Sequence, residues 1–260
     1  MPYSDLVFEL DDRIAHITLN RPQAANTLSL EMSRELLDAA IHCEEEGARA
    51  VLLSGAGRMF CAGGDLRSFA TRQGISLTTY VTETLTALHA ALSRLTRMDA
   101  PVIAAVHGSA AGAGFSLICA CDLVLAATSA RFTMAYTRSG LTPDGSATYF
   151  LPRLVGLRRA LELTLTNRVL SAQEACQWGL VTRVVGEDEL PAAAMELAQQ
   201  LAQGPTGAFG ATKRLLQQSF GERLESQLEN EARAILKALA GAESREGITA
   251  FLEKRSPNFK

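Results

Sequence analysis

A stretch of twenty residues without a formal charge, from Val102 to Cys121, restricts the possible folds of this chain more than any other segment. Its length and the small-residue spacing of Gly108 to Gly112 would suit a membrane-spanning helix. However, the stretch contains His107 and two serines, and Asp122 follows it directly. These polar interruptions favour a buried strand followed by a buried helix in a soluble core, so we expect no contact with a membrane.

The order of strand, helix and strand recurs along the first 200 residues. Apolar runs predict strands at 6–10, 14–19, 50–54, 102–106, 123–126 and 181–185. Helical spacing predicts helices at 30–45, 77–95 and 113–120, and another that follows Gly145 and runs to Val155, while Ser171 and Glu174 form a capping box. Such repeated units indicate an α/β fold with parallel strand pairing.

The pattern is helical from Leu190 to Glu253, with breaks at Gly204-Pro205, Gly221 and Gly241. We therefore divide the chain into an α/β core at residues 1–200 and a helical C-terminal region at residues 201–260. The second part is too short to bury its own apolar face, so it must dock on its own core or on another subunit.

Composition excludes several classes of protein. Lys and Arg total 25 against 28 Asp and Glu, for a net charge of −3, so no basic surface suggests a nucleic-acid partner. The five cysteines are odd in number and scattered, and the four histidines lack metal-ligand spacing, so we expect neither a disulfide framework nor a metal site.

The acidic N-terminus carries no targeting signal, and we expect a cytoplasmic protein. No phosphate-binding loop, zinc-peptidase motif or nucleophile elbow is present.

Two loops of small residues remain as candidate functional features. One covers Arg58 to Leu66 and the other Gly108 to Gly114, and each follows an expected strand. Small side chains let a ligand approach backbone N–H groups, and a helix N-terminus adds its positive end. Two such loops that face one point would form an oxyanion hole. The alternative is that these glycines serve only tight turns and close packing.

An ordered set of motifs extends this interpretation over nearly the whole chain. The set comprises Leu19–Pro22 with Asn26, Phe60–Leu66, Gly108–Gly114 with Cys121-Asp122, Gly140–Gly145, Leu151–Gly156 and Glu246–Lys254. With these motifs the chain resembles the crotonase (enoyl-CoA hydratase/isomerase) superfamily. The resemblance implies an α/β fold in which repeated ββα units form a spiral, followed by a helical C-terminal region used in oligomer contacts. It also implies homotrimers, often paired into hexamers, and acyl-CoA thioester substrates.

The same resemblance implies a set of binding residues. The amides of Gly64 and Ala113 would form the oxyanion hole for a thioester enolate. The residues beside the CoA moiety would be Ala62, Gly63, Gly64, Asp65 and Leu66, with Ala24 on the opposite wall and Phe251 and Lys254 reaching CoA from the tail, often from a neighbouring subunit. For Lys254, a solvated charge on a helix face is an equal alternative. No cofactor besides the CoA of the substrate is implied.

Departures from the family pattern limit the reactions that this chain is expected to catalyse. Hydratases of the family carry two glutamates, and the matching positions here hold Ser116 and Tyr136, neither of which can act as a carboxylate base. Asp144 stands where ring-forming, ring-isomerising and dehalogenating relatives bear an acid. Considered alone, an Asp between Pro and Gly is typical of a turn or a helix N-cap, but the resemblance favours a catalytic role. Tyr136 could hydrogen-bond the substrate or simply pack, and packing is the favoured role. Ser116 is expected only to line its helix.

These observations predict an acyl-CoA enzyme that stabilises a thioester enolate. The predicted activity is that of an enoyl-CoA isomerase, of the Δ3,Δ2 type or a ring type as in phenylacetyl-CoA epoxide isomerisation, with Asp144 as acid and base. Two alternatives remain open at this point. One is a hydratase, hydrolase or lyase of the same family, and the other is a catalytically silent acyl-CoA-binding protein.

Overall fold

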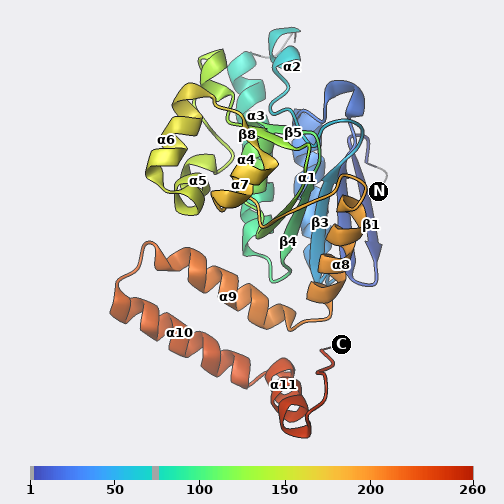
Figure 1. Ribbon diagram of the computed structural model, residues 1–260, viewed down its shortest axis with the longest axis vertical. Coiled ribbons are helices and arrows are strands. Elements are labelled where there is room, and N and C mark those ends of the chain that lie inside the picture. The colour runs from blue at the N-terminus through green and yellow to red at the C-terminus, as the bar shows by residue number, and fades with distance from the viewer. Residues whose placement is uncertain (1–2, 72–75, 260) are drawn as a thin grey trace.

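The computed structural model, which describes residues 3–71 and 76–259, is built around a six-stranded sheet in the order β1-β2-β3-β4-β6-β9 (Figure 1). These strands are β1 (Leu6–Asp11), β2 (Ile14–Leu19), β3 (Ala50–Gly55), β4 (Val102–Val106), β6 (Leu123–Ala127) and β9 (Arg183–Val185). The first pair is antiparallel, as expected for a hairpin, and every later pair is parallel. The strand predictions and the predicted parallel pairing are confirmed.

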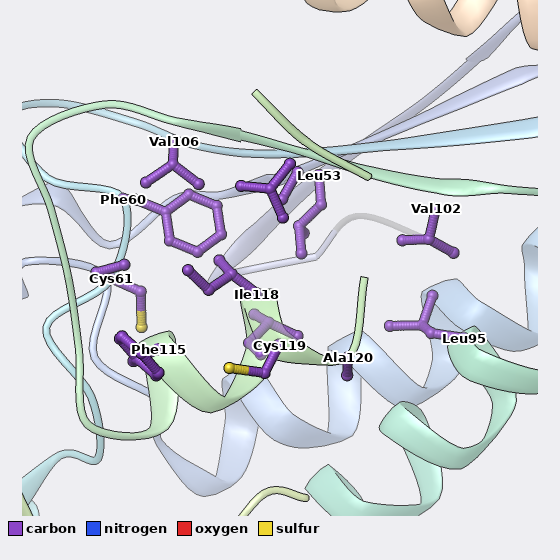
Figure 2. Packing of buried hydrophobic residues seen from close by; sticks show 14 of the residues in the cluster. Leu53, Phe60, Cys61, Leu95, Val102, Val106, Phe115, Ile118, Cys119 and Ala120 are labelled. Carbon is purple, nitrogen blue, oxygen red and sulfur yellow. The ribbon is translucent and has the colours of Figure 1, made fainter. Parts of the chain in front are cut away.

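Helices cover both faces of this sheet. On one face lie α1 (Leu30–Glu45) and α3 (Leu77–Arg97), and on the other lies α8 (Leu190–Ala202). Successive residues of β3 alternate between the two apolar clusters: Val51 and Leu53 face α1 and α3, whereas Ala50 and Leu52 face α8. The first cluster also holds Phe60, Phe115 and Ile118, which Figure 2 shows packed together.

The uncharged stretch divides into β4, β5 (Ser109–Ala111) and α4 (Ala113–Cys119), which are largely buried. The expected order of strand and helix is therefore confirmed, with β5 as an unexpected short strand between them. Among the residues that the model describes, no helix combines the length and the apolar character needed to cross a membrane.

A second, smaller sheet has the order β5-β7-β8, with β7 at Arg131–Thr133 and β8 at Leu170–Ser171. The sequence pattern does not predict it, because strands of two or three residues show no periodicity. Around it lie α5 (Ala147–Val155), α6 (Leu157–Thr166) and α7 (Ala172–Gln177), the last opened by the predicted capping box. The short elements α2 (Leu66–Thr71), η1 (Pro22–Ala24) and η2 (Tyr136–Ser139) belong to loops near the candidate site.

The C-terminal region consists of α9 (Thr206–Ser219), α10 (Leu224–Leu239) and α11 (Ala242–Glu253), which extend away from the sheets (Figure 1). The helices end at the predicted glycine breaks. α10 has no buried residue, and its exposed apolar side chains are Leu224, Leu228, Ile235, Leu236 and Leu239. As predicted, this region does not bury its own apolar surface.

One largely buried ion pair attaches the C-terminal region to the core. Lys213 Nζ on α9 lies 2.6 Å from Asp122 Oδ2 and also donates to the carbonyl oxygens of Leu95 and Ala100, at 3.4 and 3.2 Å. The same carboxylate oxygen accepts the N–H of Val102 at 2.8 Å. Burial raises the pKa of Asp122, and the Lys213 ammonium acts against that effect. The carboxylate therefore depends on Lys213 to remain charged in the folded state.

We expect Lys213→Met to lower the free energy of unfolding by about 3 kcal/mol, because it leaves a buried carboxylate without its cation. The loss should be smaller at low pH, where protonation neutralises Asp122 in the folded state. Urea unfolding at several pH values measures both effects. Arg214→Met is the matched control, since its ion pair with Asp99 is exposed and should be worth less than about 1 kcal/mol. Equal losses in the two variants would contradict this account.

Candidate functional site

The two small-residue loops lie side by side and are joined by backbone hydrogen bonds. Cys61 N–H donates to Ser109 O at 3.1 Å, and Ala111 N–H donates to Cys61 O at 2.9 Å. Cys61 thereby pairs in parallel with Ala110 of β5. Because β3 and β4 are neighbouring parallel strands, the loops that follow them leave the same edge of the sheet.

Glycine is required where the loops touch. A Cβ on Gly114 would lie 2.5 Å from Cys61 O and 2.6 Å from Cys61 Cβ, which no side chain can occupy. Gly63 has a φ of +108°, and a Cβ there would lie 3.0 Å from Ala111 O. These glycines do serve close packing, which was the alternative to a functional role. However, the packing also brings two backbone segments together at one cavity.

The side chain of Asn26 fixes the shape of the loop from Arg58 to Leu66. Its fully buried side-chain Nδ2 donates to Ala56 O and Met59 O, both at 2.8 Å, and to Phe60 O at 3.1 Å. Its Oδ1 accepts the N–H of Arg21 at 2.8 Å. The sequence marks Asn26 only as part of a motif. A polar residue that is buried and must satisfy several carbonyl groups is recognised only from the folded chain.

The amides of Gly64 and Ala113 line one cavity of about 390 Å³. Ala113 is the first residue of α4, so its N–H has no acceptor within the helix. Within residues 3–71 and 76–259, neither amide donates to a backbone carbonyl. Two unpaired donors at one cavity can stabilise an oxyanion, as the sequence analysis expected.

One wall of the cavity is aliphatic and comes mainly from α3. Leu77, Val81, Leu85 and Leu88 follow one another at helical spacing on that wall, and Leu141 faces the same cavity. The sequence predicted this helix but assigned it no role in binding. Its spacing could have indicated a buried face, although not that part of the face borders a cavity.

Asp144 lines the same cavity from the loop between η2 and α5. It is the only carboxylate among the described residues that line this space. Ser146, not Asp144, is the N-cap residue of α5, so the helix-cap alternative is wrong. Instead, the Asp144 carboxylate accepts a hydrogen bond from the Tyr136 hydroxyl through Oδ1.

Tyr136 also lines the cavity, and its hydroxyl does more than pack. Ser116 Oγ lies 2.9 Å from Tyr136 Oη, and the phenol donates to Asp144. Burial, followed by the nearby charge of Asp144, raises the pKa of Tyr136, so the phenol remains protonated. The expectation that Tyr136 only packs and that Ser116 only lines its helix is therefore corrected.

The structure groups some of the expected CoA residues and separates others. Ala62, Gly63 and Leu66 line the cavity beside the Gly64 amide, whereas Ala24 on η1 does not. Asp65 is buried and does not line it either: its carboxylate accepts from Arg21 Nη2 and from Ser68 N–H, both at 3.1 Å. Burial would raise the pKa of Asp65, but these hydrogen bonds outweigh it and lower the pKa. The contribution of Asp65 is thus to hold the loop and the start of α2.

Phe251 and Lys254 lie at the end of α11 and do not line the cavity, and Phe251 is 81% exposed. Figure 1 shows α11 at the far end of the molecule from α2. A single chain therefore does not bring them to the other CoA residues. Their predicted contact with CoA, from a neighbouring subunit, stays a prediction.

Comparison with known proteins places this site in a family. The family model for enoyl-CoA hydratase/isomerase matches residues 9–260. A protein of Rhodobacter capsulatus named "Probable enoyl-CoA hydratase" is 40% identical over 100% of this chain and 99% of its own length. The 1,2-epoxyphenylacetyl-CoA isomerase of Escherichia coli is 37% identical over 98% of this chain and 97% of its own.

A solved structure agrees with the sequence relatives. The crystal structure of an enoyl-CoA hydratase from a Polaromonas species matches with a TM-score of 0.91 and 33% identity, covering 98% of this chain and 99% of that one. The 4-chlorobenzoyl coenzyme A dehalogenase-2 of an Arthrobacter species is 34% identical over 95% of this chain and 90% of its own. Fold, sequence and cavity thus agree, and the chain belongs to the enoyl-CoA hydratase/isomerase family, with the crotonase fold that the motifs implied.

Proposed function

We propose that this enzyme isomerises an unsaturated or ring-bearing acyl-CoA thioester through an enolate, with Asp144 as the acid and base. The observation that carries the proposal is the lining of the cavity. Two unpaired amides, from Gly64 and Ala113, and one carboxylate, from Asp144, share it. The remaining wall is largely aliphatic, which suits the hydrocarbon part of an acyl group.

The proposed reaction moves one proton between two carbon atoms. The carboxylate of Asp144 takes a proton from C2 of a 3-enoyl thioester, and the electron pair of that C–H bond passes into the thioester carbonyl. The N–H groups of Gly64 and Ala113 stabilise the resulting oxyanion, and each donor is worth on the order of 3 kcal/mol in comparable sites. Asp144 then returns the proton to C4, and the double bond lies between C2 and C3. The atoms balance without a cofactor beyond the CoA of the substrate.

Water addition is the second candidate, because the Rhodobacter capsulatus relative is named a probable hydratase. Against it, the positions at which family hydratases carry glutamates hold the hydroxyls of Ser116 and Tyr136. Both hydroxyls are engaged with each other and with Asp144 rather than exposed as bases. The Escherichia coli relative, an epoxyphenylacetyl-CoA isomerase, supports isomerisation. Mass spectrometry separates the two, since a hydrated product is one water heavier than its substrate and an isomer has the same mass.

Asp144→Asn should lower kcat by about 1,000-fold or more while CoA-ester affinity changes only a few-fold, because the amides that bind the thioester oxygen are untouched. Turnover of 3-enoyl and phenylacetyl-derived CoA esters, together with calorimetric binding, tests this expectation. Asp188→Asn, on the exposed turn before α8, controls for the loss of one carboxylate. Undiminished turnover in the Asp144 variant would remove this residue from the mechanism. Wild-type binding without turnover of any ester would instead favour a silent acyl-CoA-binding protein.

Gly114→Ala should lower kcat/KM by about 100-fold or more, because the added methyl group pushes Cys61 away and displaces both donor amides. We expect CoA-ester affinity to fall as well, which distinguishes this variant from Asp144→Asn. Gly221→Ala is the matched control: its new Cβ would meet only Gln218 O, at 3.8 Å. Equal values of kcat/KM for Gly114→Ala and Gly221→Ala in steady-state kinetics would contradict the proposed oxyanion hole.

We further propose that the chain acts as a homotrimer or as a hexamer formed from two trimers. The apolar side chains left exposed on α10 support this, because a monomer rarely leaves so continuous an apolar face in water. In such an assembly, Phe251 and Lys254 of one subunit would reach the CoA bound by the next. Sedimentation equilibrium should give three or six times the mass of one chain, and a monomer at micromolar concentration would contradict the proposal.

A further inference from the structure

We propose that Ser116 and Tyr136 are positioning residues for Asp144. Their hydroxyls form a hydrogen-bond chain in which Ser116 donates to Tyr136 and Tyr136 donates to Asp144. This chain fixes which carboxylate oxygen of Asp144 exchanges the proton. This inference rests on the proposed function, because it concerns the group that moves the proton. The three side chains come from α4, η2 and the loop before α5, so only the folded chain brings them together.

The direction of the chain follows from counting protons. A phenol has one proton, and an ionised carboxylate only accepts, so Tyr136 Oη donates to Asp144 Oδ1. The Ser116 hydroxyl, 2.9 Å from the same phenol oxygen, must then be the donor in that contact. Its other acceptor, Gly112 O, is at the long distance of 3.4 Å, so the Ser116 proton goes to Tyr136.

Ser116, the first donor of this hydrogen-bond chain, is held rigidly in place. It is fully buried, and its N–H bonds to Gly112 O at 3.0 Å. Figure 2 shows Phe115, Ile118 and Cys119 of the same helix packed within the apolar core. A side chain placed at this position therefore has little freedom to move, and neither does the phenol that it contacts.

The turn that carries Asp144 rests directly on Ser116. Gly145 has a φ of +57°, and a Cβ there would lie 3.0 Å from Ser116 Cβ. The same helix begins at Ala113, one of the two proposed donor amides. Thus α4 positions one donor of the oxyanion hole at its first residue and the carboxylate through its fourth.

The chain has two consequences for Asp144. The hydrogen bond from the Tyr136 phenol holds the carboxylate in one orientation. It also occupies Oδ1, whereas Oδ2 has no hydrogen-bond partner in the part of the protein that the model describes. Oδ2 is therefore the oxygen that takes and returns the proton. The other titratable group at this turn is the exposed His89 on α3, whose Nε2 accepts Gly145 N–H at 3.4 Å.

The test is the NMR chemical shift of the Asp144 carboxyl carbon at neutral pH in protein labelled with ¹³C-aspartate, which needs neither substrate nor turnover. Asp144→Asn assigns the signal, and the imidazole signal of His89 is followed in parallel. The variants are Tyr136→Phe, Ser116→Ala and the double variant. Tyr149→Phe is the matched control, because it removes the hydroxyl of a tyrosine that is 44% exposed and does not line the cavity.

We expect this signal to shift in Tyr136→Phe, since the carboxylate loses its donor. Ser116→Ala should move it less, in the same direction, and should have no further effect in the Tyr136→Phe background, because the chain is already broken there. Tyr149→Phe should leave it in place, and circular dichroism should show all variants folded.

An unchanged Asp144 signal in Tyr136→Phe would overturn the hydrogen-bond chain, and so would an effect of Ser116→Ala that adds in full to that of Tyr136→Phe. The proposed isomerase activity is judged separately, by the product formed from 3-enoyl-CoA by the wild-type enzyme. Absence of isomerisation together with the expected signal changes removes the proposed function and supports the hydrogen-bond chain. Isomerisation with an unchanged Asp144 signal supports the function and removes the hydrogen-bond chain.

Discussion

Close contact between the backbones of two loops, at residues with small side chains, determines the geometry of this site. Gly114 packs so closely against Cys61 that a single added methyl group does not fit, and hydrogen bonds from Cys61 to β5 hold the two loops in register. Because the segments follow neighbouring parallel strands, their amides reach one cavity without any side chain having to supply a donor. Such donors are fixed before substrate arrives, and donors that need not reorganise are the effective kind for stabilising an enolate oxygen.

The carboxylate that lines this cavity depends on the same helix as the Ala113 donor. α4 is buried along its whole length, starts at the Ala113 amide and presents Ser116 to the phenol that holds Asp144. A shift of this helix would therefore move the oxyanion donor and the carboxylate together. This arrangement explains why a short helix made largely of small and apolar residues lies at the centre of the molecule: its packing, not its charge, sets the distance between the reacting groups.

Much of the fold could be predicted from the sequence, because its signals are local. The helix at Leu30–Glu45 and the strand at Val102–Val106 have the predicted bounds, since apolar spacing and an N-cap serine mark them within a few residues. The sheet of β5, β7 and β8 could not be predicted, because its strands are short and pair across the chain. Both small-residue loops could be predicted from the sequence. The hydrogen bond between Tyr136 and Asp144 could not, because it joins two loop residues whose orientation depends on Ser116.

Charge explains why two hydroxyls and one carboxylate form a coherent set. The hydroxyls of Ser116 and Tyr136 are neutral, and the Tyr136 phenol donates to Asp144. Carboxylates at these two positions would add negative charges near Asp144, and closely spaced like charges cannot all be ionised. With neutral hydroxyls, Asp144 carries the only negative charge among the described residues lining the cavity, and the Tyr136 phenol stabilises it. A proton that leaves one carbon then has a single carboxylate to receive it, and the same group can return it to another carbon.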